Sequence, residues 1–231
     1  MTAEGTPDVD ARGPGATTAR RRPVIRPAAP GRVPHPDDPR ADDAVHRDPA
    51  ASYARAAAGS TVDARERAVV TAQLGRPARG QPAVVHRCRW DLPTVVRVAP
   101  KLEDGTPFPT TFWLSCPALR SAIGTLEADQ SMVGLNDRLQ DDGEFAGEYA
   151  AAHERYVGFR DDLGGQLEGD PGAGGMPGYV KCLHVHAAHH LATGDNVVGA
   201  WTVDAAAPVR CHGPCVDPAD IDGAVSPEDG P

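Results

Sequence analysis

The stretch TTFWLSCPALRSAIGTLEA, residues 110–128, changes its apolar period partway along. Its first part, TTFWLSCP, is short, rich in β-branched and aromatic residues and bounded by turn formers, which predicts a strand. Pro117 then suits the first turn of a helix. Leu119, Ile123 and Leu126 follow at spacings of four and three, which predicts a helix. The stretch therefore marks the point at which a β part of the chain gives way to an α part.

Two similar apolar segments precede this stretch. They are QPAVVHRC, residues 81–88, and PTVVRVAP, residues 93–100, and both have the composition of strands. The connection to the third strand contains Asp104 and Gly105, a turn signal. Because the strands are short and closely spaced, we expect a small antiparallel sheet of three strands.

Helical periodicity surrounds the predicted sheet. Residues 61–74 fit a helix that ends near Leu74, before Gly75. After Gly143, apolar residues alternate spacings of four and three, which predicts an amphipathic helix with one aromatic-rich face. Its face consists of Phe145, Tyr149, Ala152, Tyr156, Phe159 and Leu163. We expect this helix to pair with the preceding one as an antiparallel hairpin joined at residues 141–143, so the predicted fold class is α+β.

Domain limits follow from proline content and apolar patterning. Residues 1–64 carry prolines so spaced that no long helix or central strand fits, and we expect a disordered arm. We expect one globular domain over residues 65–215 and a disordered acidic tail over residues 216–231. The arginines at 20–22 are not followed by the apolar core of a secretory signal, and no stretch is long and apolar enough to cross a bilayer. We therefore expect a cytoplasmic protein.

The negative charge belongs to the predicted domain and tail. The whole chain has a formal charge of -9, and residues 1–64 contain nine basic and nine acidic residues. Residues 65–231 therefore hold 14 basic and 23 acidic residues. An acidic body lacks the positive surface that phosphate backbones require, so the composition does not favour nucleic acid as its partner.

The stretch VKCLHVHAAHH, residues 180–190, concentrates chemistry-bearing side chains. The glycine-rich lead before it does not have the pattern of a phosphate-binding loop. We expect Pro177 to lie in the first turn of a helix that runs to about Thr193. On such a helix Cys182, His186 and His189 share a face, and His184 points elsewhere.

Four strings together resemble a known family: HRC at 86–88, DGTPFPTTFWLSCP at 104–117, AHERY at 152–156 and GGMPGYVKCLH at 174–184. They are similar to the bacterial, largely actinobacterial, domain of unknown function 501 family, over residues 70 to about 200. The resemblance implies no established activity. Many members read C-P-C-G where this chain has Cys88, Arg89, Trp90 and Asp91, so a second thiol is missing near position 90.

We consider a metal site first. Zinc takes four N or S donors, usually from close C-x2-C pairs, which this chain lacks, whereas iron–sulfur clusters accept thiolates from scattered positions. A site of either kind would draw its donors from several segments. The candidate metal ligands are Cys88, Cys116, Cys182, His184, His189 and Cys215. The expected cofactor is accordingly zinc or an iron–sulfur cluster.

Two other hypotheses stay open. In a thiol-dependent enzyme, Cys182 would be the nucleophile and His186 or His189 the base, although the sequence identifies no orienting acid. In a non-catalytic interaction protein, the arm or the helical hairpin would contact a protein partner. The resemblance links such a partner to cell envelope or division, because genes of the family often lie near those of enolase, a septum-formation protein and an exopolyphosphatase.

Overall fold

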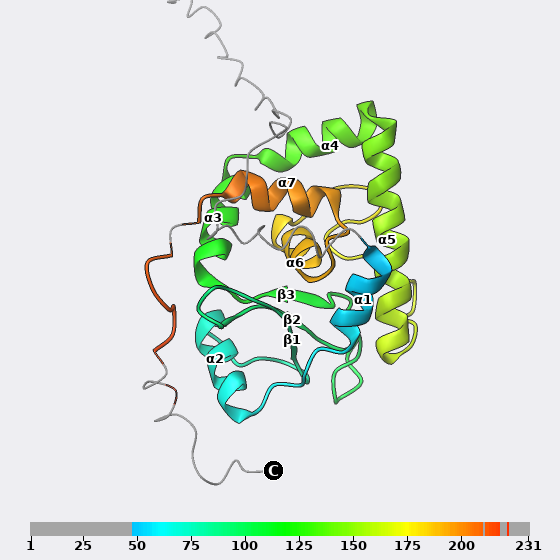
Figure 1. Cartoon of the computed structure of the whole chain (residues 1–231). Helices are drawn as coiled ribbons and strands as arrows, with labels where there is room; N and C mark the ends of the chain where they lie inside the picture. The colour runs from blue at the N-terminus through cyan, green and yellow to red at the C-terminus, as the bar shows by residue number, and fades with distance from the viewer. Residues whose placement is uncertain (1–47, 210, 218–220, 222–231) are drawn as a thin grey trace, which may run out of the picture.

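The computed structural model describes residues 48–209, 211–217 and 221. Within them, helices and one antiparallel sheet form an α+β fold, as predicted (Figure 1). The strands are β1 (Ala83–Arg87), β2 (Pro93–Arg97) and β3 (Phe112–Leu114). The helices are α1 (Pro49–Ala57), α2 (Ala64–Leu74), α3 (Pro117–Ala128), α4 (Ser131–Asp141), α5 (Gly143–Gly164), α6 (Leu183–Thr193) and α7 (Val197–Ala206).

The sheet has the order β1-β2-β3, with antiparallel neighbours. Strand β2 lies in the middle and is buried on both faces, because successive side chains of a strand point to opposite sides. Val95 faces the large core with Phe112 and Leu114, and Val96 faces a smaller cluster with Val84. The sheet therefore separates two hydrophobic layers.

Helix α2 covers the smaller layer (Figure 1). It begins after Asp63, whose carboxylate accepts a hydrogen bond from the backbone of Glu66. It ends at Gly75, whose φ of 69° is the left-handed conformation that glycine adopts without strain. Val70 on this helix is fully buried against the sheet. The expected helix at residues 61–74 is thus present.

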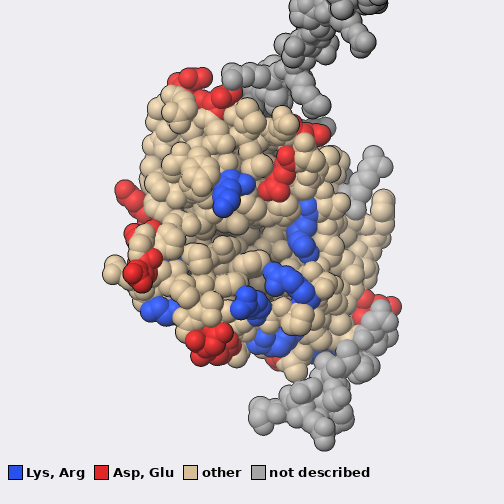
Figure 2. Space-filling model, turned by 180° about the vertical axis from the view of Figure 1, so that it is seen from behind, with Lys and Arg blue, Asp and Glu red and all other residues tan. Residues whose placement is uncertain are grey.

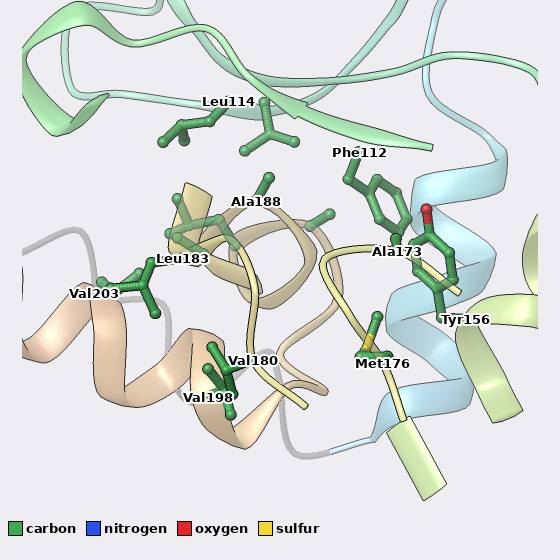
Figure 3. Packing of buried hydrophobic residues seen from close by; sticks show 14 of the residues in the cluster. Phe112, Leu114, Tyr156, Ala173, Met176, Val180, Leu183, Ala188, Val198 and Val203 are labelled. Atoms are coloured by element: carbon green, nitrogen blue, oxygen red, sulfur yellow. The ribbon is translucent and has the colours of Figure 1, made fainter. Parts of the chain in front are cut away.

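Helix α6 is the centre of the large layer, between the sheet on one side and α7 on the other (Figures 1 and 3). It also contacts α1 and α3. Leu183 and Ala188 of α6 are completely buried, and Figure 3 shows them between Leu114 of β3 and Val203 of α7. Because apolar groups surround α6, its polar side chains must find partners within the protein.

Helices α4 and α5 meet at a single residue. Asp142 ends α4 and caps α5, because its carboxylate accepts from Phe145 N at 3.1 Å and pairs with Arg138 at 3.0 Å. The two helices contact one another. In Figure 1, α4 crosses the top of the molecule and α5 runs down its side, so the expected hairpin has the shape of a corner.

The folded body extends beyond the predicted domain at both ends. Helix α1 lies inside the expected arm, yet its Tyr53 and Ala56 are buried in the large core. Val216 and Ile221, inside the expected tail, are buried against Val69 of α2. Short apolar segments gain their burial from distant partners, which local periodicity does not reveal. Residues 1–47 of the expected arm and residues 218–220 and 222–231 of the expected tail lie outside the described residues.

Charge is unevenly distributed over the surface. Figure 2 shows lysine and arginine side chains gathered around the middle and lower part of one face, with acidic side chains mostly toward its edge. The net charge of -9 therefore does not describe every face. In the part of the chain that the structure describes, no helix combines the length and the apolar character needed to cross a membrane.

Candidate metal centre

Cys182 and His184 lie at the N-terminal end of α6. The helix begins at Leu183, and Cys182 precedes it with an extended backbone, at φ -145° and ψ 112°. The expected start near Pro177 does not hold, because Asn136 of α4 holds Val180 in place with a hydrogen bond at 2.7 Å to its N–H and another at 3.0 Å to its carbonyl. The shared face of Cys182, His186 and His189 therefore does not exist, since Cys182 is outside the helix.

Glu127, in the last turn of α3, completes this group. Its Oε1 accepts a hydrogen bond from Leu183 N at 2.7 Å and lies 3.1 Å from His184 Nδ1. A carboxylate at the N-terminus of a helix is favourable, because it satisfies a free N–H group and faces the positive end of the helix dipole. The contact fixes the end of α3 against the start of α6.

His184 is held from its other side as well. Its Nε2 lies 3.0 Å from the carbonyl oxygen of Arg120, one turn after the start of α3. The pKa of His184 is raised to about 9, mainly by its hydrogen bond with Cys182 and further by the Arg120 carbonyl and Glu127, against the opposing effect of burial. Without a metal the ring is an imidazolium at neutral pH, and its Nε2–H donates to Arg120.

The ligand atoms of Glu127, Cys182 and His184 all lie within 4.8 Å of one another. Tetrahedral zinc, with bonds of 2.0–2.3 Å, places N and O ligands about 3.4 Å apart, close to the 3.1 Å between His184 Nδ1 and Glu127 Oε1. All three residues are half-buried. Metal-binding histidines usually donate their second N–H to a carbonyl or carboxylate, as Nε2 of His184 is placed to do. The donor set therefore suits a zinc-class ion.

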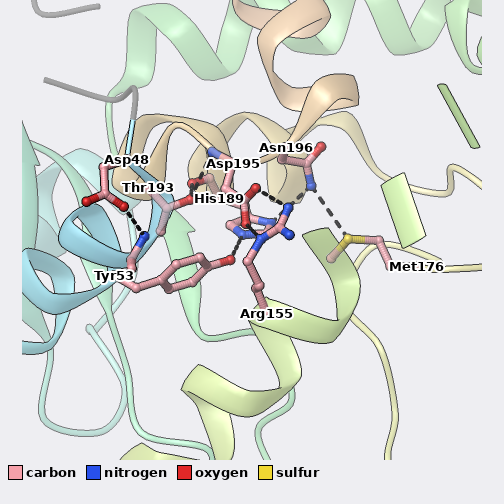
Figure 4. Close-up of polar contacts among 9 residues, drawn as sticks. Asp48, Tyr53, Arg155, Met176, His189, Thr193, Asp195 and Asn196 are labelled. Atoms are coloured by element: carbon pink, nitrogen blue, oxygen red, sulfur yellow. Dashed lines mark hydrogen bonds and ion pairs between the residues drawn. The ribbon is translucent and has the colours of Figure 1, made fainter. Parts of the chain in front are cut away.

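His189 does not belong to this group. Its Nε2 lies 2.5 Å from the Tyr53 hydroxyl, and its Nδ1 accepts from Asn196 Nδ2 at 3.0 Å. Figure 4 shows the ring between Tyr53 of α1 and Asn196 at the start of α7. Both ring nitrogens are thus engaged inside the core. The structure does not bring His189 to Cys182.

Asn196 organises a pair of buried histidines. Its Oδ1 accepts from Gly199 N at 2.8 Å and so caps α7, which turns Nδ2 toward Nδ1 of His189 and Nδ1 of His186, the latter at 3.3 Å. Two acceptor Nδ1 atoms require the Nε2–H tautomer in both rings. His186 then donates to Gly174 O at 3.1 Å. Burial lowers the pKa of His186 to about 4 and that of His189 well below 6.5, so both rings are neutral at pH 7.

An ion pair closes this network toward the surface. The guanidinium of Arg155 on α5 binds both carboxylate oxygens of Asp195, which is buried beside Tyr53 (Figure 4). Burial, and then the charge of Asp195, raise the pKa of Tyr53 far above its ordinary value. Every side chain of this network has a hydrogen-bond or ion-pair partner within the protein. The network therefore has a structural role, which is to join α1, α5, α6 and α7.

Cys88, Cys116 and Cys215 do not belong to the group of ligand atoms around Cys182. Cys116 immediately precedes α3, and Cys88 and Cys215 are close enough to raise its pKa electrostatically, after the larger effect of burial. Of the six predicted ligands, the structure thus brings Cys182 to His184 and places His189 in the core, while Cys88 and Cys215 are near enough to Cys116 to affect its pKa.

Glu127 and Asn196 are the functional candidates that the sequence did not indicate. Glu127 is one of many acidic residues, and only the contact between α3 and α6 distinguishes it. Asn196 carries a local signal, since it follows Gly194 and precedes an apolar run, as residues that cap helices do. That signal predicts a cap and does not predict two histidine partners.

Comparison with known proteins finds a family match that runs from β1 to α7. Residues 84–204 match the family described as protein of unknown function, DUF501. The chain belongs to this family. The matched range of this DUF501 chain contains Glu127, Cys182 and His184, and it excludes Tyr53 and Cys215. No curated protein and no solved structure matches the chain.

Proposed function

We propose that this protein binds a zinc-class divalent metal ion through Cys182 Sγ, His184 Nδ1 and a carboxylate oxygen of Glu127. The observation that carries the proposal is the approach of these three ligand atoms to within 4.8 Å of one another. They come from two helix ends that the fold packs together. Three protein ligands leave one tetrahedral position for water or a substrate, which is the composition of catalytic zinc sites.

The chemistry of such an ion would be that of a Lewis acid. A zinc ion lowers the pKa of bound water and polarises carbonyl or phosphoryl oxygens. The protein itself would orient the ligands: Leu183 N–H holds Glu127, and the Arg120 carbonyl holds the His184 ring. Binding must displace the proton from Nδ1 of His184, so affinity should fall as the pH decreases.

Cobalt substitution tests this proposal. The purified chain is loaded with Co²⁺, which replaces Zn²⁺ in tetrahedral sites and gives absorption from the metal and from its thiolate bond. We expect Cys182→Ser to remove the part of this absorption that comes from the Cys182 thiolate and His184→Gln to weaken binding at this site at least about tenfold. His212→Gln is the matched control, because His212 is exposed and outside the group. Unchanged cobalt spectra and affinity in both Cys182→Ser and His184→Gln would refute the proposal.

A thiol-dependent reaction is the second candidate, favoured by the proximity of the Cys182 and His184 ligand atoms. A thiol beside an imidazolium loses its proton more readily and becomes a nucleophile. This pairing differs from the expected one, since His184 replaces His186 or His189. Alkylation with iodoacetamide in the presence of a chelator tests it: Cys182 should react faster than Cys211, and an equal or slower rate would count against it.

We also propose a cytoplasmic location. All five cysteines are free, as is usual in a reducing compartment. The hypothesis of a protein partner in cell envelope or division functions remains a prediction.

A further inference from the structure

The segments of three cysteines are anchored by hydrogen bonds around the start of β2. Cys88 N donates to the carbonyl of Leu92 at 2.9 Å. The carbonyl of the next residue, Pro93, accepts from Ser115 Oγ at 3.0 Å, and Ser115 directly precedes Cys116. The segments of Cys88 and Cys116 are thus held at the neighbouring carbonyls of Leu92 and Pro93. Cys215 approaches Pro93 through a side chain of α2.

That side chain is Gln73. Its Nε2 donates to Pro93 O at 2.9 Å and to Cys215 Sγ at 3.4 Å. Val216, next to Cys215, is buried against Val69 of the same helix. Figure 1 shows the segment after α7 passing down the side of α3 to reach α2. Packing therefore brings Cys215 to Gln73 and the start of β2, although this segment has neither helix nor strand.

Gln73 provides an independent sign of a missing ligand. Its side chain is only 4% exposed, and within the described part of the chain its Oε1 has no hydrogen-bond partner. Because the oxygen and nitrogen of an amide share one carbon, this oxygen lies close to the sulfur of Cys215. A buried acceptor without a partner is unfavourable, and a cation or a donor at this position would remove the cost.

The electrostatics agree with the geometry. Burial is the main cause of the raised pKa of Cys116, and the neighbouring Cys215 and Cys88 raise it further. Thiolates close to one another repel, and a cation bound between them offsets this repulsion because it attracts each thiolate. Soft thiolate donors select zinc and other thiophilic ions over magnesium or calcium.

We propose that Cys88, Cys116 and Cys215 form a second site, for a thiophilic metal ion of the zinc class, with Gln73 Oε1 or water as the fourth donor. The site is independent of Glu127, Cys182 and His184. Among the described residues, only those three have ligand atoms within 4.8 Å of one another, so the three thiols are spread more widely. An ion would draw them together through movement of residues 211–217.

Metal stoichiometry of the full chain separates the two sites. After dialysis against Zn²⁺, we expect two equivalents in the unaltered chain and one in Cys116→Ser or Cys215→Ser. Cys182→Ser should lose only the zinc ion of the site that Cys182 forms with Glu127 and His184. Failure of either site can therefore be recognised separately. Cys211→Ser is the matched control, because Cys211 lies four residues from Cys215 and its thiol donates to Gly213 O. Full zinc content in both Cys116→Ser and Cys215→Ser would overturn the proposal.

A second measurement needs no substitution and so cannot fail through misfolding. The chain is alkylated with and without Zn²⁺, and each cysteine is quantified by mass spectrometry. Zinc should slow modification of Cys88 and Cys215 at least about tenfold, because a metal-bound thiolate is a poor nucleophile for the alkylating reagent. Cys211 should keep its rate. Equal protection of Cys88, Cys215 and Cys211, or protection of none of them, would contradict the proposed site.

Discussion

His184 Nδ1 in the first turn of α6 lies 3.1 Å from Glu127 Oε1 in the last turn of α3. The same carboxylate oxygen also accepts the backbone N–H of Leu183. The contact thus joins two helix ends and brings two side chains of the proposed metal site toward one point. Cys182, the residue before the helix, adds a sulfur at that point.

Glu127→Gln should weaken zinc binding by at least about tenfold with little effect on folding. The amide oxygen can still accept from Leu183 N, but the charge that attracts the metal is lost. Competition with a chromogenic chelator measures the affinity, and urea unfolding of the metal-free chain measures the stability. Asp129→Asn, an exposed change just after the same helix, is the control and should keep the affinity. Equal zinc affinities in the two variants would exclude Glu127 as a ligand.

Asn196→Ala should reduce the free energy of unfolding by about 2–4 kcal/mol, because it removes the cap of α7 and the donor to two buried imidazoles. Asn196→Asp keeps the capping oxygen but replaces the donor with a charged carboxylate oxygen. Urea unfolding at pH 7 compares the two. If the aspartate variant were as stable as the original chain, the hydrogen bonds from Asn196 Nδ2 to His186 and His189 would not contribute to stability.

Stability should decrease as the pH falls below about 6.5, the ordinary pKa of a histidine in an unfolded chain. Burial holds the pKa of His189 well below that value in the folded protein. Between the two values the unfolded chain binds more protons than the folded one, so acid favours unfolding. One such histidine contributes at most about 1.4 kcal/mol per pH unit. Above about 6.5 the contribution of His189 is fully retained.

Urea unfolding at pH 7.5, 6.5 and 5.5 tests this dependence. His189→Gln should make the pH profile less steep, because one of the two buried histidines is gone while His186 remains. His212→Gln, at an exposed position, should keep the slope of the original chain. The same slope in His189→Gln as in the original chain would assign the acid sensitivity to other groups.

A chain shortened to begin at residue 65 should be less stable than one that begins at residue 48, by at least about 3 kcal/mol. The shortening removes Tyr53 and Ala56 from the core and leaves His189 Nε2 without its hydroxyl partner. Thermal unfolding of both chains measures the difference. Equal melting temperatures would mean that α1 adds nothing to the folded body.

The sequence alone determined the secondary structure of most of the body. The β-branched composition of residues 93–97, helical spacing from Leu119 onward and the stop signal at Gly75 all act between neighbours in the chain, so they can be read locally. The α+β class follows from their order. Helix α1 escaped this reasoning because its apolar residues are few, and Tyr53 is buried by contacts with segments more than 100 residues away.

Only the tertiary structure decided which residues form a site. Cys182 is close to His184 because its backbone is extended, and a helical wheel places the two far apart. Glu127 reaches His184 across 57 positions of sequence through the packing of α3 on α6. Periodicity specifies which face of a helix is buried, whereas the partner on the other side depends on how the core packs, and that information is spread over the whole chain.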